Sequence, residues 1–132
     1  MLKSQFEAAG HTFENLHQNY HLAVQDGIFQ TVQSQEKRVF ATADMVEYVQ
    51  NYLKSQDFNF PSKITFVSKY YYDKSGYLDW WVLELMELPE IMPTNEQLDL
   101  FVAHLKNALT HFKLPIQATK KFYFHTIIDF NQ

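Results

Sequence analysis

The chain has no cysteine and only three glycines among its 132 residues. Without cysteine it can form no disulfide, no thiolate nucleophile and no cysteine-ligated metal site. With glycine only at positions 10, 27 and 76, it contains no phosphate-binding loop, no dinucleotide fingerprint and no glycine-flanked serine elbow. We therefore expect no catalytic residues and no cofactor, and the sequence favours a protein that is not an enzyme.

Positive charge and long apolar runs are also scarce. Eleven basic residues, with Arg38 the only arginine, stand against fifteen acidic ones and leave a net charge of −4. Nucleic acids and anionic membranes are bound by clustered lysine and arginine, so we expect neither as a partner. There is no run of about 18 apolar residues, and the opening residues lack the apolar core of a signal peptide. These absences predict a cytoplasmic protein.

Apolar and aromatic side chains, in contrast, are abundant. They make up 46% and 17% of the chain, and the aromatic residues include twelve phenylalanines and eight tyrosines. That content is enough to build the core of one domain, and rings should fill much of it. Because no linker or repeat interrupts residues 1–132, the sequence predicts a single domain.

The first 30 residues predict a helix and a turn. Apolar residues recur at steps of three and four from Leu2 onward, which predicts a helix that ends near Asn19. Gly10 interrupts this pattern and weakens the early turns. Asp26-Gly27 is a strong hairpin signal, although Gly27 could instead cap a helix that runs to Gln25. We favour the hairpin.

The next segment predicts strands followed by a second helix. β-Branched and aromatic residues are frequent between Ile28 and Phe40, and they favour strands there. Thr42 is a suitable N-cap, and Asp44 complements the dipole of a helix that starts at this point. An apolar stripe carries that helix to about Ser55.

Residues 63–72 and 77–88 predict a long β-hairpin. They are joined by Asp73-Lys74-Ser75-Gly76, a sequence typical of a type I turn followed by a left-handed bulge residue. With this turn, Tyr72 pairs with Leu78 and Tyr70 pairs with Trp80. A two-residue loop would pair Tyr70 with Asp79 instead, and the two registers exchange the faces of the tryptophans.

The end of the chain predicts a helix and a final strand. Thr94 and Gln97 form a capping-box pattern at the start of the helix, and Pro115 stops it. Residues 120–130 then alternate apolar and polar. We expect a single α+β domain in which an antiparallel sheet carries its helices on one face, in the order α-β-β-(β)-α-β-β-α-β.

Part of this order resembles a known family. Helix, three strands, helix, two strands, helix is similar to the order in type III secretion chaperones, which are small acidic dimers that hold secreted effectors. The likeness rests on element order alone, and the final strand has no place in it.

Histidines do not form a convincing site. Glu14, His17 and His21 lie at i, i+3 and i+7, so a continuous helix would let them share a metal ion. The predicted helix ends before His21, however, and a solvated polar face explains the spacing more simply. His104 and His111 lie two helical turns apart on the predicted helix and cannot both ligate one metal ion, and His125 lies in the middle of the final strand. We expect neither a metal site nor a catalytic histidine.

Negative charge is concentrated between Ser75 and Lys106, where six carboxylates occur without lysine or arginine. Glu96 and Asp99 are accounted for by the start of the following helix, whose dipole favours acidic side chains. The rest of the acidic span follows one strand and its exit loop, beside two tryptophans. These residues form the predicted partner-binding surface: Asp79, Trp80, Trp81, Glu84, Glu87 and Glu90.

This surface suggests a function in protein binding. The first hypothesis is a small non-enzymatic protein that docks a basic protein partner, as an immunity protein or an effector chaperone would. The alternative is a ligand-binding or enzymatic domain with a pocket between sheet and helices, lined by Tyr70, Tyr72 and a histidine. A third hypothesis is a homodimer that buries the aromatic side chains.

Overall fold

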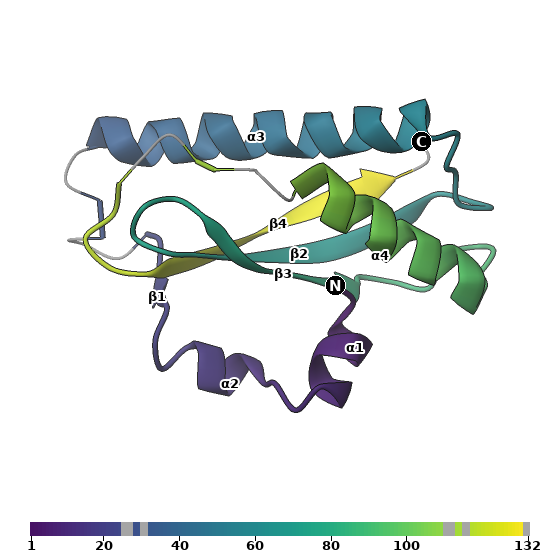
Figure 1. The fold of residues 1–132 in the computed structure, drawn as a ribbon, viewed down its shortest axis with the longest axis horizontal. Helices are drawn as coiled ribbons and strands as arrows, with labels where there is room; N and C mark the ends of the chain where they lie inside the picture. Colours follow the sequence, from purple (N-terminus) through teal and green to yellow (C-terminus); the bar gives the residue numbers. More distant parts are fainter. Residues whose placement is uncertain (25–27, 30–31, 110–112, 115–116, 131–132) are drawn as a thin grey trace.

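The computed structural model describes residues 1–24, 28–29, 32–109, 113–114 and 117–130. This part of the chain forms four helices and four strands (Figure 1). In chain order they are α1 (Lys3–Ala8), α2 (Phe13–Leu16), β1 (His21–Leu22), α3 (Val32–Ser55), β2 (Ile64–Tyr72), β3 (Leu78–Leu85), α4 (Asn95–Leu109) and β4 (Phe122–Phe130). The α+β class is confirmed, and the predicted element order is only partly right. None of the described helices is long and apolar enough to cross a membrane.

The strands form one mixed sheet in the order β1-β4-β2-β3. β2 runs antiparallel to both β3 and β4, whereas β1 pairs in parallel with β4. The prediction of a wholly antiparallel sheet is therefore wrong at this edge. Helices also cover both faces, with α3 and α4 on one side and the small helices α1 and α2 on the other (Figure 1). The prediction that all helices share one face is wrong.

From Val32 onward, helix α3 replaces the strands predicted between Ile28 and Phe40, and residues 30–31 of that prediction lie outside the described part of the chain. Residues 33–38 are mostly long, unbranched side chains that favour helix, and helix growth from an established segment is cooperative. Thr42 consequently lies inside the helix rather than at its N-cap. Its Oγ1 donates to the carbonyl oxygen of Arg38 at 2.7 Å, the bond that a helical threonine makes to the preceding turn.

The first predicted helix is divided at Gly10, which has a positive φ of 88°. Glycine adopts this conformation without steric cost, so α1 ends there. α2 then begins afresh, with the Thr12 hydroxyl accepting from the Asn15 N–H at 3.1 Å. The hairpin predicted at Asp26-Gly27 lies outside the described residues. The alternative helix running to Gln25 is wrong, because His21–Leu22 is a strand.

The β2–β3 hairpin confirms the predicted turn and corrects the register beyond it. Gly76 has a φ of 93°, and Tyr72 pairs with Leu78 as expected. A bulge then adds one residue to β3, so that Tyr70 pairs with Trp81 rather than with Trp80 or Asp79. The first predicted register is therefore right at its first pair and wrong beyond it, and the register of the two-residue loop is wrong throughout.

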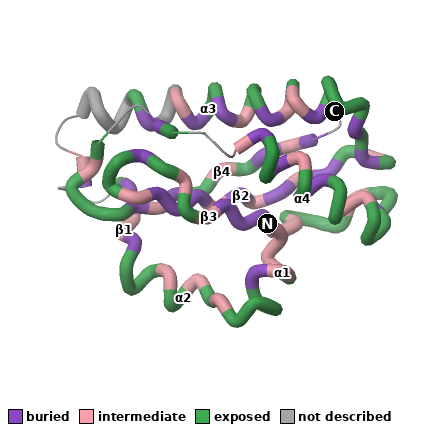
Figure 2. Tube along the Cα trace, in the orientation of Figure 1, coloured by how far each residue is buried: buried purple, intermediate pink, exposed green. Residues whose placement is uncertain are grey.

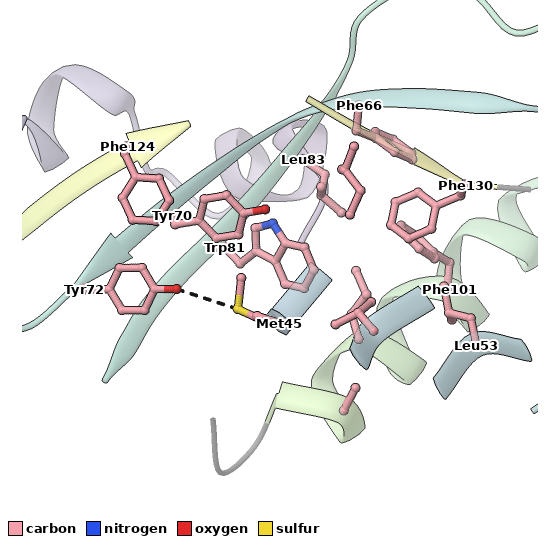
Figure 3. Close-up of a cluster of buried hydrophobic side chains, with 14 of the residues drawn as sticks. Met45, Leu53, Phe66, Tyr70, Tyr72, Trp81, Leu83, Phe101, Phe124 and Phe130 are labelled. Atoms are coloured by element: carbon pink, nitrogen blue, oxygen red, sulfur yellow. Dashed lines mark hydrogen bonds between the residues drawn. The ribbon is translucent and has the colours of Figure 1, made fainter. Parts of the chain in front are cut away.

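Residues on alternate positions of β2 define the two faces of the sheet. Tyr70 and Tyr72 point toward α3 and α4, and both are fully buried there (Figure 3). The Tyr72 hydroxyl contacts the sulfur of Met45 on α3 at 3.7 Å. Tyr71 points to the opposite face, toward α1 and α2, and is also fully buried. We call these the α3/α4 face and the α1/α2 face.

The helix and the final strand predicted at the end of the chain are confirmed as α4 and β4, whereas the helix stop predicted at Pro115 lies outside the described residues. The capping box forms with both of its bonds, since the Thr94 N–H donates to Gln97 Oε1 at 2.8 Å and the Gln97 N–H to Thr94 Oγ1 at 3.1 Å. Phe101 of α4 stacks on Phe66 of β2 at 5.7 Å between ring centroids. Buried positions lie along the strands and on the sheet side of α3 and α4 (Figure 2). Rings thus dominate this core, as the composition predicted.

Candidate functional site

Trp81 of the predicted surface belongs to the core. Its side chain is 6% exposed and stacks on Tyr70 at 5.6 Å between ring centroids (Figure 3). The indole N–H donates to the hydroxyl of Ser68, which explains a fully buried serine among aromatic rings. A buried tryptophan cannot anchor a partner on the surface.

Trp80 lies on the α1/α2 face, because it is the next residue along β3. The Phe6 ring meets it edge-on at 5.6 Å, and the His11 ring lies 4.7 Å away. It is half-buried under residues from the start of the chain, far from it in the sequence. Periodicity within β3 could not predict this cover.

Asp79 occupies the bulge and is bound by Tyr20. The Tyr20 hydroxyl donates to Asp79 Oδ2 at 2.7 Å. Burial raises the pKa of Tyr20 well above its ordinary range, and the hydrogen bond to the carboxylate raises it further. Asp79 therefore holds Tyr20, which follows α2 in the chain, against the sheet.

Glu84 is paired with Lys3 from the start of the chain. The Lys3 ammonium lies 3.1 Å from Glu84 Oε1 and 3.6 Å from Glu7 Oε1. Hydrogen bonding to Glu84 and the charge of its carboxylate raise the pKa of Lys3. The carboxylate of Glu84 is thus partly neutralised by this chain itself.

Residues 1–3 also extend the sheet. The Met1 nitrogen donates to the Trp81 carbonyl oxygen at 2.5 Å, and the Leu83 N–H donates to the Met1 carbonyl oxygen at 2.8 Å. Leu2 and Leu83 form a parallel bridge. The outer edge of β3 is therefore covered here by residues 1–3, and the first 20 residues contact Asp79, Trp80, Trp81 and Glu84.

Glu87 and Glu90 lie elsewhere, in the exposed segment between β3 and α4. We call residues 86–92 the acidic loop. Both glutamates are exposed, and the loop also presents four large apolar side chains to solvent: Met86 at 54%, Leu88 at 82%, Ile91 at 52% and Met92 at 51%. The sequence prediction missed these apolar residues. Their position beside Pro89 and Pro93, which cannot continue a strand, was the available signal.

The acidic loop is held to the body of the domain. The Met86 N–H donates to the Thr65 carbonyl oxygen at 3.0 Å, at the end of β3. The Ile91 N–H donates to Ser62 Oγ at 3.1 Å, and Ser62 Oγ donates back to the Ile91 carbonyl oxygen at 3.2 Å. Pro93 is buried. The exposed side chains therefore project from a fixed backbone.

A second cluster of side chains joins α2 and His17, the residue that follows it, to the sheet. His17 Nε2 and the Tyr71 hydroxyl are hydrogen-bonded at 2.9 Å, and the His17 ring stacks on Tyr123 at 4.2 Å. The Lys69 ammonium lies 3.7 Å from the centroid of the Phe13 ring, a cation–π contact. Burial lowers the pKa of His17, and the charge of Lys69 lowers it further. The described residues contain no group of three acidic or histidine side chains arranged to hold a metal ion.

Two hollows open on the described surface, and neither matches the pocket of the alternative hypothesis. One, of about 160 Å³, lies between the end of α3 and Phe60. The other, of about 400 Å³, lies between α4 and the outer edge of β3, beside Lys106. Tyr70 and Tyr72 line neither of them and are fully buried.

The fold and these contacts define a small α+β domain with a mixed sheet and an exposed acidic loop. Comparison with protein-family models, with curated proteins and with solved structures found no significant match. A functional interpretation therefore has to come from the surface itself.

Proposed function

We propose that this protein is a non-enzymatic binding protein that docks a basic, partly apolar segment of a protein partner on the acidic loop. The observation that carries the proposal is the composition of the loop surface. Four exposed large apolar side chains alternate there with Glu87 and Glu90. This loop belongs to the span between Ser75 and Lys106 that contains no lysine or arginine.

The combination of chemistries specifies the kind of partner. Exposed methionine, leucine and isoleucine side chains give contact area that adapts to different shapes. Carboxylates around them attract a basic partner and disfavour an acidic one. Lys63 is paired with Asp129 at 3.9 Å and Lys3 with Glu84 at 3.1 Å. Among the described residues no ion pair involves Glu87 or Glu90, so their negative charge is left for a partner.

The hydrogen bonds that hold the loop support the same proposal. Binding to a mobile loop loses affinity because the loop must be ordered first. Here Thr65 of β2 and Ser62, just before β2, hold the loop backbone at Met86 and Ile91. The anchor role that was expected of a tryptophan passes to the apolar side chains of the loop, because Trp81 is buried and Trp80 is half-covered.

The test is charge reversal in the loop. We expect Glu87→Lys with Glu90→Lys to abolish capture of the partner from the native cell, with no change in melting temperature, because both side chains are exposed. The matched control is Asp44→Lys with Glu47→Lys, which makes the same change of charge on exposed positions of α3. The control should capture the partner normally.

The identity of the captured protein decides the outcome. Mass spectrometry should find one protein with a segment that is both basic and apolar, and its binding to the purified chain should weaken as salt is raised. Equal capture by both double variants would contradict the proposal. Loss of capture in both would show that only net charge matters, and would contradict a docking site at the loop.

A further inference from the structure

The outer edge of β3 is the feature that the proposed function leaves unexplained. β3 is the last strand of the sheet, and edge strands offer backbone groups to any extended chain. Residues 1–3 take this position in parallel orientation, with Leu2 opposite Leu83. Immediately afterward the chain turns away into α1, which begins at Lys3.

We propose that this edge is a strand-addition site, which Met1–Lys3 fill in the present structure and which an extended basic segment of the partner takes in their place. The proposal rests on the proposed function for the basic character of the partner. It adds the mode of binding and a competitor within the chain. Recognition by strand addition obtains affinity from backbone hydrogen bonds and specificity from alternate side chains.

The residues that now cover the edge indicate which residues a partner segment would need in their place. Leu2 is half-buried against the core, and Lys3 places an ammonium group on Glu84. A segment with an apolar residue followed by a lysine would reproduce both contacts. Lys3 therefore acts as an internal substitute for a basic residue of the partner.

The edge also leads to the acidic loop. Trp81 and Leu83 direct their backbone groups outward, and by alternation Leu85 does the same. An added strand that stays extended, rather than turning into a helix at Lys3, runs past Leu85 and reaches the loop at Glu87. One continuous segment could then use the β3 edge and the loop together.

The chain start that covers the β3 edge is held less firmly at residues 1–3 than at α1. Residues 1–3 are attached by two hydrogen bonds to β3, by the packing of half-buried Leu2 and by an ion pair whose side chains are about two-fifths exposed. The hydrogen bonds and the ion pair have a small net worth, because water replaces them on opening. Phe6, in contrast, is fully buried against Trp80 and keeps α1 in place. Exchange at the edge therefore needs only a local opening.

A disulfide lock tests the exchange. The chain has no cysteine, so Leu2→Cys with Leu83→Cys creates one pair at a bridge position, where the backbones are close enough to be linked. The probe is the synthetic peptide MLKVKVK, which repeats residues 1–3 and continues as a basic strand. We expect the oxidised variant to bind it at least tenfold more weakly than the reduced variant, measured by tryptophan fluorescence.

The outcomes are separable from those of the loop test. Equal binding in both redox states, or no binding in either, would overturn strand addition, and capture through Glu87 and Glu90 would stand or fall by its own experiment. Concentration-dependent dimerisation of the reduced variant alone, seen by light scattering, would overturn the partner as occupant, since residues 1–3 of a second copy would then fill the edge.

Hydrogen exchange on the unmodified chain provides a measurement that no substitution can disturb. The Leu83 N–H is bonded to Met1, whereas Val82 faces its neighbour Lys69 within the sheet. If residues 1–3 open locally, Leu83 exchanges at least tenfold faster than Val82, and saturating MLKVKVK slows it. Equal protection of the two amides would show that the edge opens only on global unfolding, and would overturn the proposal.

Discussion

The two faces of the sheet are built from the same strands but are covered in different ways. On the α3/α4 face, apolar rings such as Phe66 and Phe101 stack in a core that two long helices close. On the α1/α2 face, Tyr71 and Tyr123 meet His17 through a hydrogen bond and a stacked ring. The first cover depends on excluded water, and the second depends on specific polar contacts that pH and salt can change.

This difference between the two faces explains why the residues of the predicted binding surface lie in different parts of the structure. Neighbouring residues of β3 point to opposite faces, so Trp81 entered the core while Trp80 came under the first residues of the chain. Carboxylates within reach of those residues, Asp79 and Glu84, became attachment points for the cover. Glu87 and Glu90, beyond the strand, stayed exposed and outside these contacts.

The largest expected effect separates the two adjacent tryptophans. Trp81→Ala should lower the free energy of unfolding by about 3–5 kcal/mol, because it leaves a cavity in the core and removes the donor to Ser68. Trp80→Ala should cost about 1–2 kcal/mol, since its side chain is only partly buried. Urea denaturation followed by circular dichroism measures both. A larger loss for Trp80 would mean that the faces are assigned in reverse.

A medium effect on stability is expected when acid protonates His17 on the α1/α2 face. The pKa of His17 is lowered in the folded chain, so near its ordinary value of about 6.5 the unfolded chain binds more protons. The stabilisation from neutral His17 is therefore present above about pH 6.5 and declines as the pH falls below it.

Urea midpoints at about pH 7.5 and pH 5 test this dependence. The His17→Gln variant should lose less stability between the two pH values than the unmodified chain does. The side chains facing His17 are Phe13, Tyr71, Tyr123 and Lys69. Lys69 remains in both proteins. An identical loss of stability in both proteins would therefore contradict His17 as the source of the pH dependence.

The smallest effect is expected at Lys3. Lys3→Gln removes the ion pair with Glu84, and the free energy of unfolding should fall by at most about 1 kcal/mol, because both side chains are partly exposed. Lys74→Gln, on an exposed residue of the hairpin turn, is the control for loss of a positive charge. The difference between the two variants should shrink in about 1 M salt. A difference that salt leaves unchanged would indicate packing of the lysine stem instead.

Local sequence signals predicted the parts of the fold whose cause is local. The capping box at Thr94 and Gln97 formed as expected, because a cap is closed by residues three positions apart. The turn after Tyr72 was also right, since Gly76 alone supplies the required positive φ. β4 followed its alternation, with Phe122, Phe124 and Phe130 buried.

Where sequence reasoning failed, distant packing made the decision. Residues 32–40 carry β-branched and aromatic side chains, yet they continue a helix whose later positions Met45, Val49 and Leu53 pack on the sheet. The one-residue bulge at Asp79 is set by fitting two long strands together, which no turn residue specifies. The acidic loop was only half predicted, because exposure of its apolar residues depends on where Ser62 holds it.

The sequence by itself determined the composition of the core, the hairpin turn, the cap at Thr94 and the concentration of acidic charge, since each depends on composition or on residues close together in the chain. Only the tertiary structure decided which face each tryptophan takes and which carboxylates remain exposed. It also placed Met1–Lys3 on the edge of β3, across 80 residues of chain. Backbone groups of any sequence can fill a sheet edge, so composition alone carries no sign of which segment does so.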